Sequence, residues 1–262
     1  MEGVCTLQIH DVCVFKDANG EYQPAAADTW YVSEDGTVYT FHIRDDAKFH
    51  DGREMLAEDV VFSLDYARNS SAFASYYESV DTVTALDEKT VQVVLHYPSA
   101  LFMSFFTNNM NFAIMCKDFY ETMGEDYATS PETMLCSGPY YVSEWQPEVS
   151  ITYTYNPYYW GEEPDIKTIK CVKITDANSA AIALQTGSID IYLSPVSGAV
   201  YNMLLNDENI VLQSYPHLRH DMVYLNEEWG IFQENPRLRE AVAYAINRQD
   251  LIDIAYEGRA VP

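Results

Sequence analysis

Apolar and polar residues alternate in one early segment of the chain, and a helical spacing follows it. Every second residue of the first part is apolar: Tyr39, Phe41 and Ile43. This is the period-two pattern of a strand with one buried face. After the turn signal Asp51-Gly52, apolar residues recur at helical spacing: Val60, Val61 and Leu64. The stretch Thr37–Leu64 therefore predicts a strand, a charged turn and an amphipathic helix.

The same patterns predict further elements along the rest of the chain. A hairpin is expected over Val80–Leu95 and a short helix over Lys117–Met123. Other strands are expected at Ile151–Tyr155, Ile166–Ile174, Ser188–Ile191 and Met222–Leu225. Further helices are expected after the capping residues Asp176, Asn235 and Asn247, the first with Gly187 as its C′ residue and the last over Gln249–Tyr256. Strand, helix and strand in this order indicate an α/β layer.

Composition narrows the classes of function. The 262 residues are 48% hydrophobic, so a substantial core is expected, and the formal net charge is −25. Such a field repels nucleic acid and anionic membrane surfaces. The acids either cover a solvated surface or line a cleft for cationic or zwitterionic ligands. The aromatic content of 14% fits either core packing or a cleft walled with rings.

Motifs for metal binding and catalysis are absent from the sequence. The five cysteines form no CxxC and their number is odd, so one or two disulfides are possible and cannot be paired from sequence. The histidines form no HExxH, and the sequence has no GxSxG, GxxxxGK[ST] or GxGxxG. We therefore expect no metal, no cofactor and no enzyme, although the abundant carboxylates leave a hydrolase with a carboxylate pair as an alternative.

The chain shows no segment that would take it into or across a membrane. No stretch approaches the ~20 apolar residues of a membrane span. The first residues, MEGVCTLQ, lack the basic and apolar regions of a signal peptide.

Four motifs resemble one family. They are YTFHIRDDAKFHDGREMLAEDVVFSL, CSGPYYVSEW, NPYYWG and NPRLREAVAYAINRQDLI. Their order and spacing resemble the family 5 extracellular solute-binding proteins, the receptors of peptide and nickel ABC importers. One departure concerns the helix start, where the family usually has Thr and this chain has Leu56. A leucine side chain accepts no hydrogen bond, so the lost cap should cost ~1 kcal/mol. The NPYYWG turn is interpreted as structural.

The resemblance implies an α/β fold of the periplasmic-binding-protein-like type II, a mixed sheet with flanking helices. It predicts a core subdomain of lobe I at 1–9 and 137–228, and an inserted strand-rich subdomain at 10–136. The opening helices of lobe II are expected at 229–262. Since family members are typically about twice as long, we expect this chain to be the first lobe with the start of the second, to bind ligand poorly alone, and to leave one apolar helix face partly uncovered: Leu238, Val242 and Ala245.

The resemblance also suggests residues that contact a ligand. The loop SAFASYY resembles a ligand loop of oligopeptide receptors, which places Phe73 and Tyr76 at the site. Phe73 keeps the ring of the family's tyrosine but lacks its hydroxyl, and Tyr76 alternatively packs in the core. The other candidates lie in three segments: Glu2, Gly3 and Val4, then Ser194, then His217 and Leu218. A plain strand start or surface loop is the alternative for these segments.

The function implied by the resemblance is capture of an oligopeptide or dipeptide outside the membrane and its delivery to ABC permease subunits. The expected location is the periplasm or, as a lipoprotein, the outer face of the cell membrane, held by an anchor that this chain lacks. Nickel chelates, haem and oligosaccharides are alternative ligands of the same fold. A gene fragment without independent function is a further alternative.

Overall fold

The computed structural model describes residues 8–107, 112–193, 198–213, 222–228, 230–256 and 258–260. The chain divides into two compact units, residues 1–173 and 174–262. The finer division predicted from the family resemblance stays a prediction.

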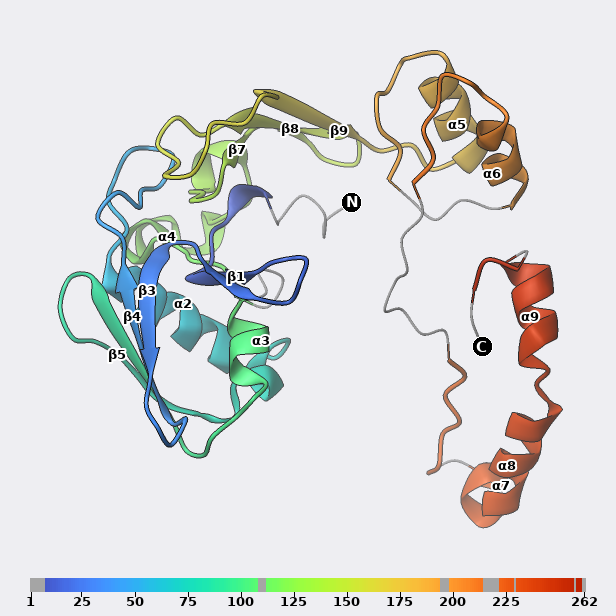
Figure 1. Ribbon diagram of the computed structural model, residues 1–262, viewed down its shortest axis with the longest axis horizontal. Coiled ribbons are helices and arrows are strands. Elements are labelled where there is room, and N and C mark those ends of the chain that lie inside the picture. The colour runs from blue at the N-terminus through green and yellow to red at the C-terminus, as the bar shows by residue number, and fades with distance from the viewer. Residues whose placement is uncertain are drawn as a thin grey trace. The chain divides into compact units, whose positions relative to one another are not determined.

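The described part of the first unit holds three antiparallel sheets (Figure 1). The first sheet pairs β1 (Val14–Lys16) with β2 (Tyr22–Pro24). The second has the order β3-β4-β6-β5, with bounds Ala27–Val32, Val38–Ile43, Thr90–Leu95 and Val80–Ala85. The third has the order β7-β8-β9, with bounds Tyr140–Gln146, Ser150–Tyr155 and Thr168–Val172. The predicted strand before the charged turn, the hairpin and the two strands near Ile151 and Ile166 are thereby confirmed.

Short helices surround these sheets. The α-helices that lie wholly within the described part of the first unit are α2 (Ala57–Asn69), α3 (Phe102–Phe106) and α4 (Lys117–Met123). The 3₁₀ helices are η1 (Ala74–Tyr77), η2 (Gly124–Asp126) and η3 (Pro131–Thr133). The longest of them, α2, packs against β5 and β6 of the four-stranded sheet (Figure 1).

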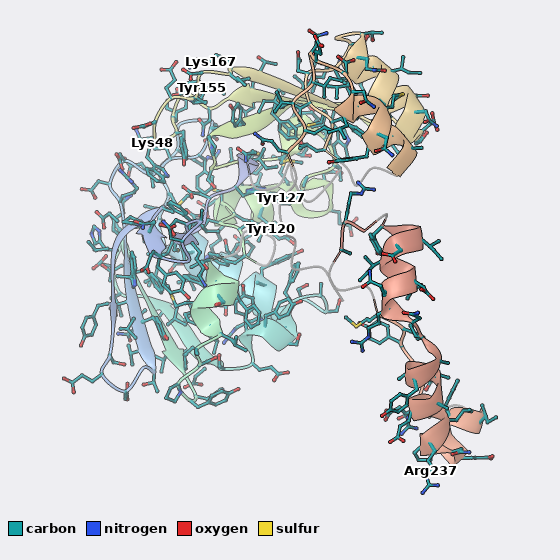
Figure 2. The ribbon with its side chains drawn as sticks, turned by 45° about the vertical axis from the view of Figure 1, so that its right-hand side comes forward. Lys48, Tyr120, Tyr127, Tyr155, Lys167 and Arg237 are labelled. Carbon is teal, nitrogen blue, oxygen red and sulfur yellow. The ribbon has the colours of Figure 1, made fainter. Side chains whose placement is uncertain are left out.

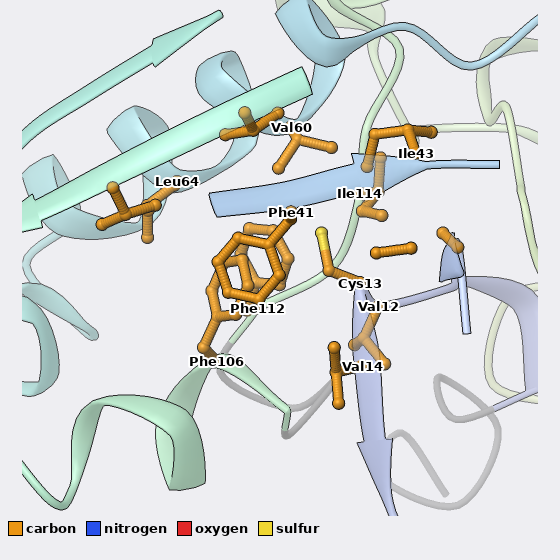
Figure 3. Close-up of a cluster of buried hydrophobic side chains, with 14 of the residues drawn as sticks. Val12, Cys13, Val14, Phe41, Ile43, Val60, Leu64, Phe106, Phe112 and Ile114 are labelled. Carbon is orange, nitrogen blue, oxygen red and sulfur yellow. The ribbon is translucent and has the colours of Figure 1, made fainter. Parts of the chain in front are cut away.

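The main core lies between the four-stranded sheet, α2 and α3. Alternate residues of β4 and β6 point into it and are fully buried, among them Phe41, Val91 and Val93. The Phe41 ring lies 5.0 Å from the ring of Phe106, which stacks 4.5 Å from that of Phe112 (Figure 3). Burying each such side chain stabilises the fold by about 1.5–3 kcal/mol.

Helix α2 begins without a cap from Leu56, and Asp59 takes over part of that role. Leu56 makes no side-chain cap bond, as the sequence predicts. The Asp59 carboxylate instead accepts the Leu56 amide N–H at Oδ2, 2.9 Å away. Its Oδ1 accepts the Lys117 amide N–H at 2.9 Å, which fixes the start of α4 beside the start of α2. Burial raises the pKa of this carboxyl group.

Two of the sequence motifs meet on the backbone of residues 8–11. The Gly138 N–H donates to the Ile9 carbonyl at 2.9 Å, and a Cβ at Gly138 would lie 2.8 Å from the Gln8 carbonyl oxygen. Only glycine fits such an approach. The Asp11 N–H donates to Ser137 Oγ at 2.9 Å, and the Trp160 indole N–H donates to the Asp11 carboxylate. These contacts support the interpretation of NPYYWG as structural.

Burial shifts the protonation of two neighbouring groups in this cluster. It raises the pKa of Asp11 to about 6, against the hydrogen bond from Trp160, which lowers it. It lowers the pKa of His10 to about 4. His10 Nδ1 is buried, and no described residue forms a hydrogen bond with it. Burial thus shifts each group towards its neutral form relative to its ordinary pKa.

The second unit contains five short helices in its described part. They are α5 (Ala177–Gln185), α6 (Gly198–Leu205), α7 (Gly230–Glu234), α8 (Pro236–Ala245) and α9 (Arg248–Ala255). The small buried cluster between α5 and α6 consists of Ala181, Val200 and Leu204.

The predicted caps of these helices have mixed outcomes. Asp176 accepts the Ser179 amide N–H at 2.8 Å, and Gly187 has the positive φ of a C′ residue, +70°. Asn247 caps α9 by accepting the Gln249 N–H at 3.1 Å. Asn235 precedes α8 but its side chain forms no cap bond, so that detail of the prediction is wrong. On α8, Leu238 and Val242 are half-buried and Ala245 is exposed, as expected.

The structure contradicts two strand predictions in this unit. Residues 188–191 are irregular because the Ser188 and Ile189 amides donate to the Ala183 carbonyl, 2.8 and 3.3 Å away, and so complete the end of α5. Residues 222–225 are irregular too. No described segment forms a ladder with either stretch, and a strand requires such a partner.

Replacing Asp59 tests the link between α2 and α4. Asp59→Ala removes two charge-assisted bonds and leaves the Leu56 and Lys117 amides without their acceptor. We expect the free energy of unfolding to fall by about 2–3 kcal/mol. Urea unfolding followed by far-UV circular dichroism measures this change. The matched control is Asp118→Ala in the first turn of α4, which should change stability by less than about 1 kcal/mol. Equal effects of the two variants would contradict the assigned role.

The pH dependence of stability tests the buried pair His10 and Asp11. The Asp11 pKa is raised, so its contribution is full below pH 3.8 and is lost as the pH rises through about 6. The His10 pKa is lowered, so its contribution is full above pH 6.5 and is lost as the pH falls towards 4. Asp11→Asn should therefore make stability rise more steeply between pH 4 and 6.5. His10→Asn should make it rise less steeply or fall.

Between pH 4 and 6.5, each variant should change the rise in the free energy of unfolding by on the order of 2–3 kcal/mol. The reason is that one pKa unit corresponds to about 1.4 kcal/mol. Urea titrations at pH 4.5, 5.5 and 6.5 measure the slopes. Asp45→Asn removes an exposed carboxylate and serves as the control. If both buried-site variants keep the parent's slope, the pKa values of the two groups are not shifted in these directions.

Candidate functional site

The structure describes one of the segments predicted to contact a ligand. Phe73 and Tyr76 belong to the described residues. The remaining candidates lie outside the described residues: Glu2, Gly3, Val4, Ser194, His217 and Leu218.

The segment 70–77, here called the aromatic loop, follows directly after α2. Its first turn is closed by the Ser70 carbonyl, which accepts the Phe73 and Ala74 amides at 3.2 and 2.9 Å. The Tyr76 amide then donates to the Phe73 carbonyl at 2.9 Å as the chain enters η1. Successive turn bonds therefore fix the backbone that carries both candidate rings.

The tyrosines of the aromatic loop contact Phe105 of α3. Tyr76 lies 6.3 Å from Phe73 and stacks 4.6 Å from Phe105, measured between ring centroids. The next residue, Tyr77, is buried and its hydroxyl donates to the Phe105 carbonyl at 3.3 Å. Tyr76 remains 37% exposed. The Tyr76 ring is therefore partly covered by its stacking on Phe105. It is not a core residue.

A surface pocket of about 580 Å³ lies at the start of the aromatic loop. Its lining residues come from α2 and the turn after it: Phe62, Asp65, Tyr66, Asn69, Ser70 and Ser71. Asp65 Oδ1 forms an ion pair with Arg68 Nε at 2.7 Å, and Arg68 Nη1 donates to the Asp81 carbonyl at 2.9 Å. Arg68 is therefore held beside the pocket.

Tyrosines of α4 and the following turn support the rings of the pocket. The Tyr120 ring lies 5.1 Å from Phe62 and 5.5 Å from Tyr66. Tyr127 in turn lies 4.8 Å from Tyr120 (Figure 2). Sequence analysis did not single out Phe62 and Tyr66. Their spacing of four residues on a helix was the available signal, because such residues are neighbours on one face.

Three further histidines of the first unit each have a different polar partner. His42 lies 3.1 Å from Asp28, and His96 lies 3.6 Å from Asp81. His50 Nδ1 accepts the Cys136 amide N–H at 3.0 Å, and burial lowers its pKa. No group of three or more metal-binding side chains gathers in the part of the chain that the structure describes.

Cys13, Cys116 and Cys136 carry buried free thiols. Burial raises the pKa of each of them, which makes these thiols unreactive. In addition, none of the helices within the described ranges is long and apolar enough to cross a bilayer.

Comparison with known proteins identifies relatives among solute receptors. The Escherichia coli (strain K12) dipeptide-binding protein is 31% identical over 272 aligned positions, which cover 94% of this chain and 50% of that protein. The Salmonella typhi glutathione-binding protein GsiB is 28% identical, covering 94% of this chain and 48% of its own length. The chain thus spans about half the length of the curated relatives that it matches.

Solved structures of solute-binding proteins are also similar to this chain. MoaA of A. tumefaciens R10, in complex with mannopinic acid, superposes with a TM-score of 0.87 at 25% identity, over 99% of this chain and 54% of that one. The Helicobacter pylori periplasmic binding protein DppA, in complex with peptide STSA, superposes with a TM-score of 0.81 at 25% identity, over 97% and 54%. These likenesses confirm the predicted fold class.

A family model covers almost the whole chain. The model of the bacterial extracellular solute-binding proteins, family 5 Middle, matches residues 21–262. Those residues include the charged turn, the aromatic loop and all four motifs quoted from the sequence. The chain belongs to the family 5 bacterial extracellular solute-binding proteins.

Proposed function

We propose that this chain supplies one lobe of a receptor that captures oligopeptides or dipeptides outside the membrane and delivers them to an ABC permease. The names of the relatives support a peptide-like ligand, since they bind dipeptides, glutathione and the peptide STSA. The chain's membership in an extracellular family supports the location.

The aromatic loop is the observation that carries the proposal. Tyr76 presents a partly exposed ring whose other side is stacked on Phe105 at 4.6 Å. A ring fixed in this way offers contact area to a ligand and loses little conformational entropy on binding. Phe73, beside it, provides a second ring without a hydroxyl. The ligand would therefore receive apolar contact from Phe73 and its polar contact at this loop from Tyr76.

The proposed mechanism is binding without chemistry. An extended peptide pairs its backbone with the protein as an added strand, which gives affinity with little selection among side chains. Two lobes then close over the peptide by a hinge motion, which shifts the population to a closed form. The known relatives are solute-binding proteins, and we propose that this chain likewise catalyses no reaction.

The proposal is tested by titrating the ¹⁵N-labelled chain with tri-alanine, glutathione and a nickel–histidine complex. We expect tri-alanine or glutathione to shift the amide signals of residues 70–77 and of Phe105. Tyr76→Ala should weaken this binding by about tenfold, because truncating a ring in a binding site costs on the order of 1–2 kcal/mol. Fits of shift against peptide concentration measure the change.

The control for the ring is Tyr31→Ala on β3, which also removes an exposed tyrosine. It should leave the affinity unchanged. A response of residues 70–77 to the nickel complex alone would replace the peptide with a metal chelate. A peptide recovered in shortened form would reveal a hydrolase, and no response of the loop to any probe would refute a ligand site there.

A further inference from the structure

We propose that the pocket beside α2 binds an organic cation, an ammonium or guanidinium group carried on an apolar or aromatic body. The whole lining comes from α2 and the turn that follows it, so the inference does not require the proposed peptide receptor function, although Ser70 and Ser71 also begin the aromatic loop. The pocket has a volume of about 580 Å³ and is open to solvent, so a small molecule has access to it.

The apolar wall of the pocket is held in place before a ligand arrives. Phe62 and Tyr66 lie one turn apart on α2, with ring centroids 6.3 Å from each other. Tyr120 contacts both rings from α4, at 5.1 and 5.5 Å. Tyr66 nevertheless remains 48% exposed, so a ligand has access to it. The negative face of an accessible aromatic ring attracts a cation.

Two polar side chains of the lining, Asp65 and Asn69, offer oxygen acceptors. Asn69 Nδ2 donates to the Asp65 backbone carbonyl at 2.7 Å, and the amide oxygen of Asn69 is an acceptor. Asp65 Oδ1 is buried against Arg68, whereas the Asp65 side chain as a whole is 43% exposed. Its exposure therefore includes Oδ2. A carboxylate and an amide oxygen in one lining match a ligand that carries N–H donors.

The charge around the pocket favours a cation over an anion. Arg68 is the nearest cation to Asp65, but it does not line the pocket and is tied to Asp65 and to the Asp81 carbonyl. The chain as a whole carries a formal charge of −25, which concentrates cations near its surface. Aromatic faces beside an accessible carboxylate oxygen form a recognised environment for ammonium groups.

The test compares three ligands of nearly the same shape and different charge: phenethylammonium, 2-phenylethanol and phenylacetate. Each is titrated into the ¹⁵N-labelled full chain, and the amide signals of residues 65–71 are followed. We expect saturable shifts with phenethylammonium, weaker ones with the alcohol and none with the anion. If 2-phenylethanol binds as tightly as phenethylammonium, the pocket is only an apolar surface and the proposal fails.

Two pairs of variants locate the binding. Asp65→Asn keeps the shape of the side chain and should weaken phenethylammonium binding by about fivefold, the upper range for an exposed ion pair. Its control, Asp45→Asn, removes the same charge from an exposed turn and should have no effect. Tyr66→Leu should weaken binding by about threefold through loss of the ring, whereas Tyr31→Leu should not. Equal effects within either pair would overturn the site.

Discussion

The close passage of residues 8–11 against the Ser137-Gly138 turn is the constraint on which the first unit depends. The Gly138 position leaves no room for a Cβ, since the Gln8 carbonyl would lie 2.8 Å from it. Ser137 Oγ accepts the Asp11 amide, and the Trp160 indole donates to the Asp11 carboxylate. Asn156 Nδ2 adds a bond to the Gly138 carbonyl at 2.9 Å. Parts of the chain far apart in sequence are therefore joined through buried polar groups, which tolerate no loss of a partner.

A second buried carboxylate, that of Asp59, connects the core to the candidate site. Asp59 joins the start of α2 to the start of α4, and α4 carries Tyr120, the ring against which Phe62 and Tyr66 rest. Fixing one end of α2 thus fixes the side chains along its outer face. The other end of the same helix leads into the aromatic loop, where Ser70 begins the turn that sets Phe73. Pocket and loop share one rigid support, as precise binding sites require.

Signals that act over a few residues allowed the sequence to predict much of this structure. Alternation indicated β4, and the acid Asp176 indicated the start of α5, whose cap bond spans only three residues. The role of Asp59 was not predicted, although an acid three residues after a missing cap is half of a capping box. The pocket was not predicted either. In the sequence, Phe62 is one more apolar position of an amphipathic helix, and only the structure shows the ring of Tyr120 beside it.

The two incorrect strand predictions show why other parts of the structure could not be predicted from the sequence. Ser188–Ile191 has the apolar alternation of a strand, but alternation describes only which face would be buried and does not provide a neighbour to pair with. The amides of Ser188 and Ile189 bond to the end of α5, a partner available five or six residues away. A backbone amide is a strong donor that pairs with an acceptor where one is within reach. Where a helix end offers one nearby, it is satisfied without any sheet, and a pattern of side chains cannot decide between the two outcomes.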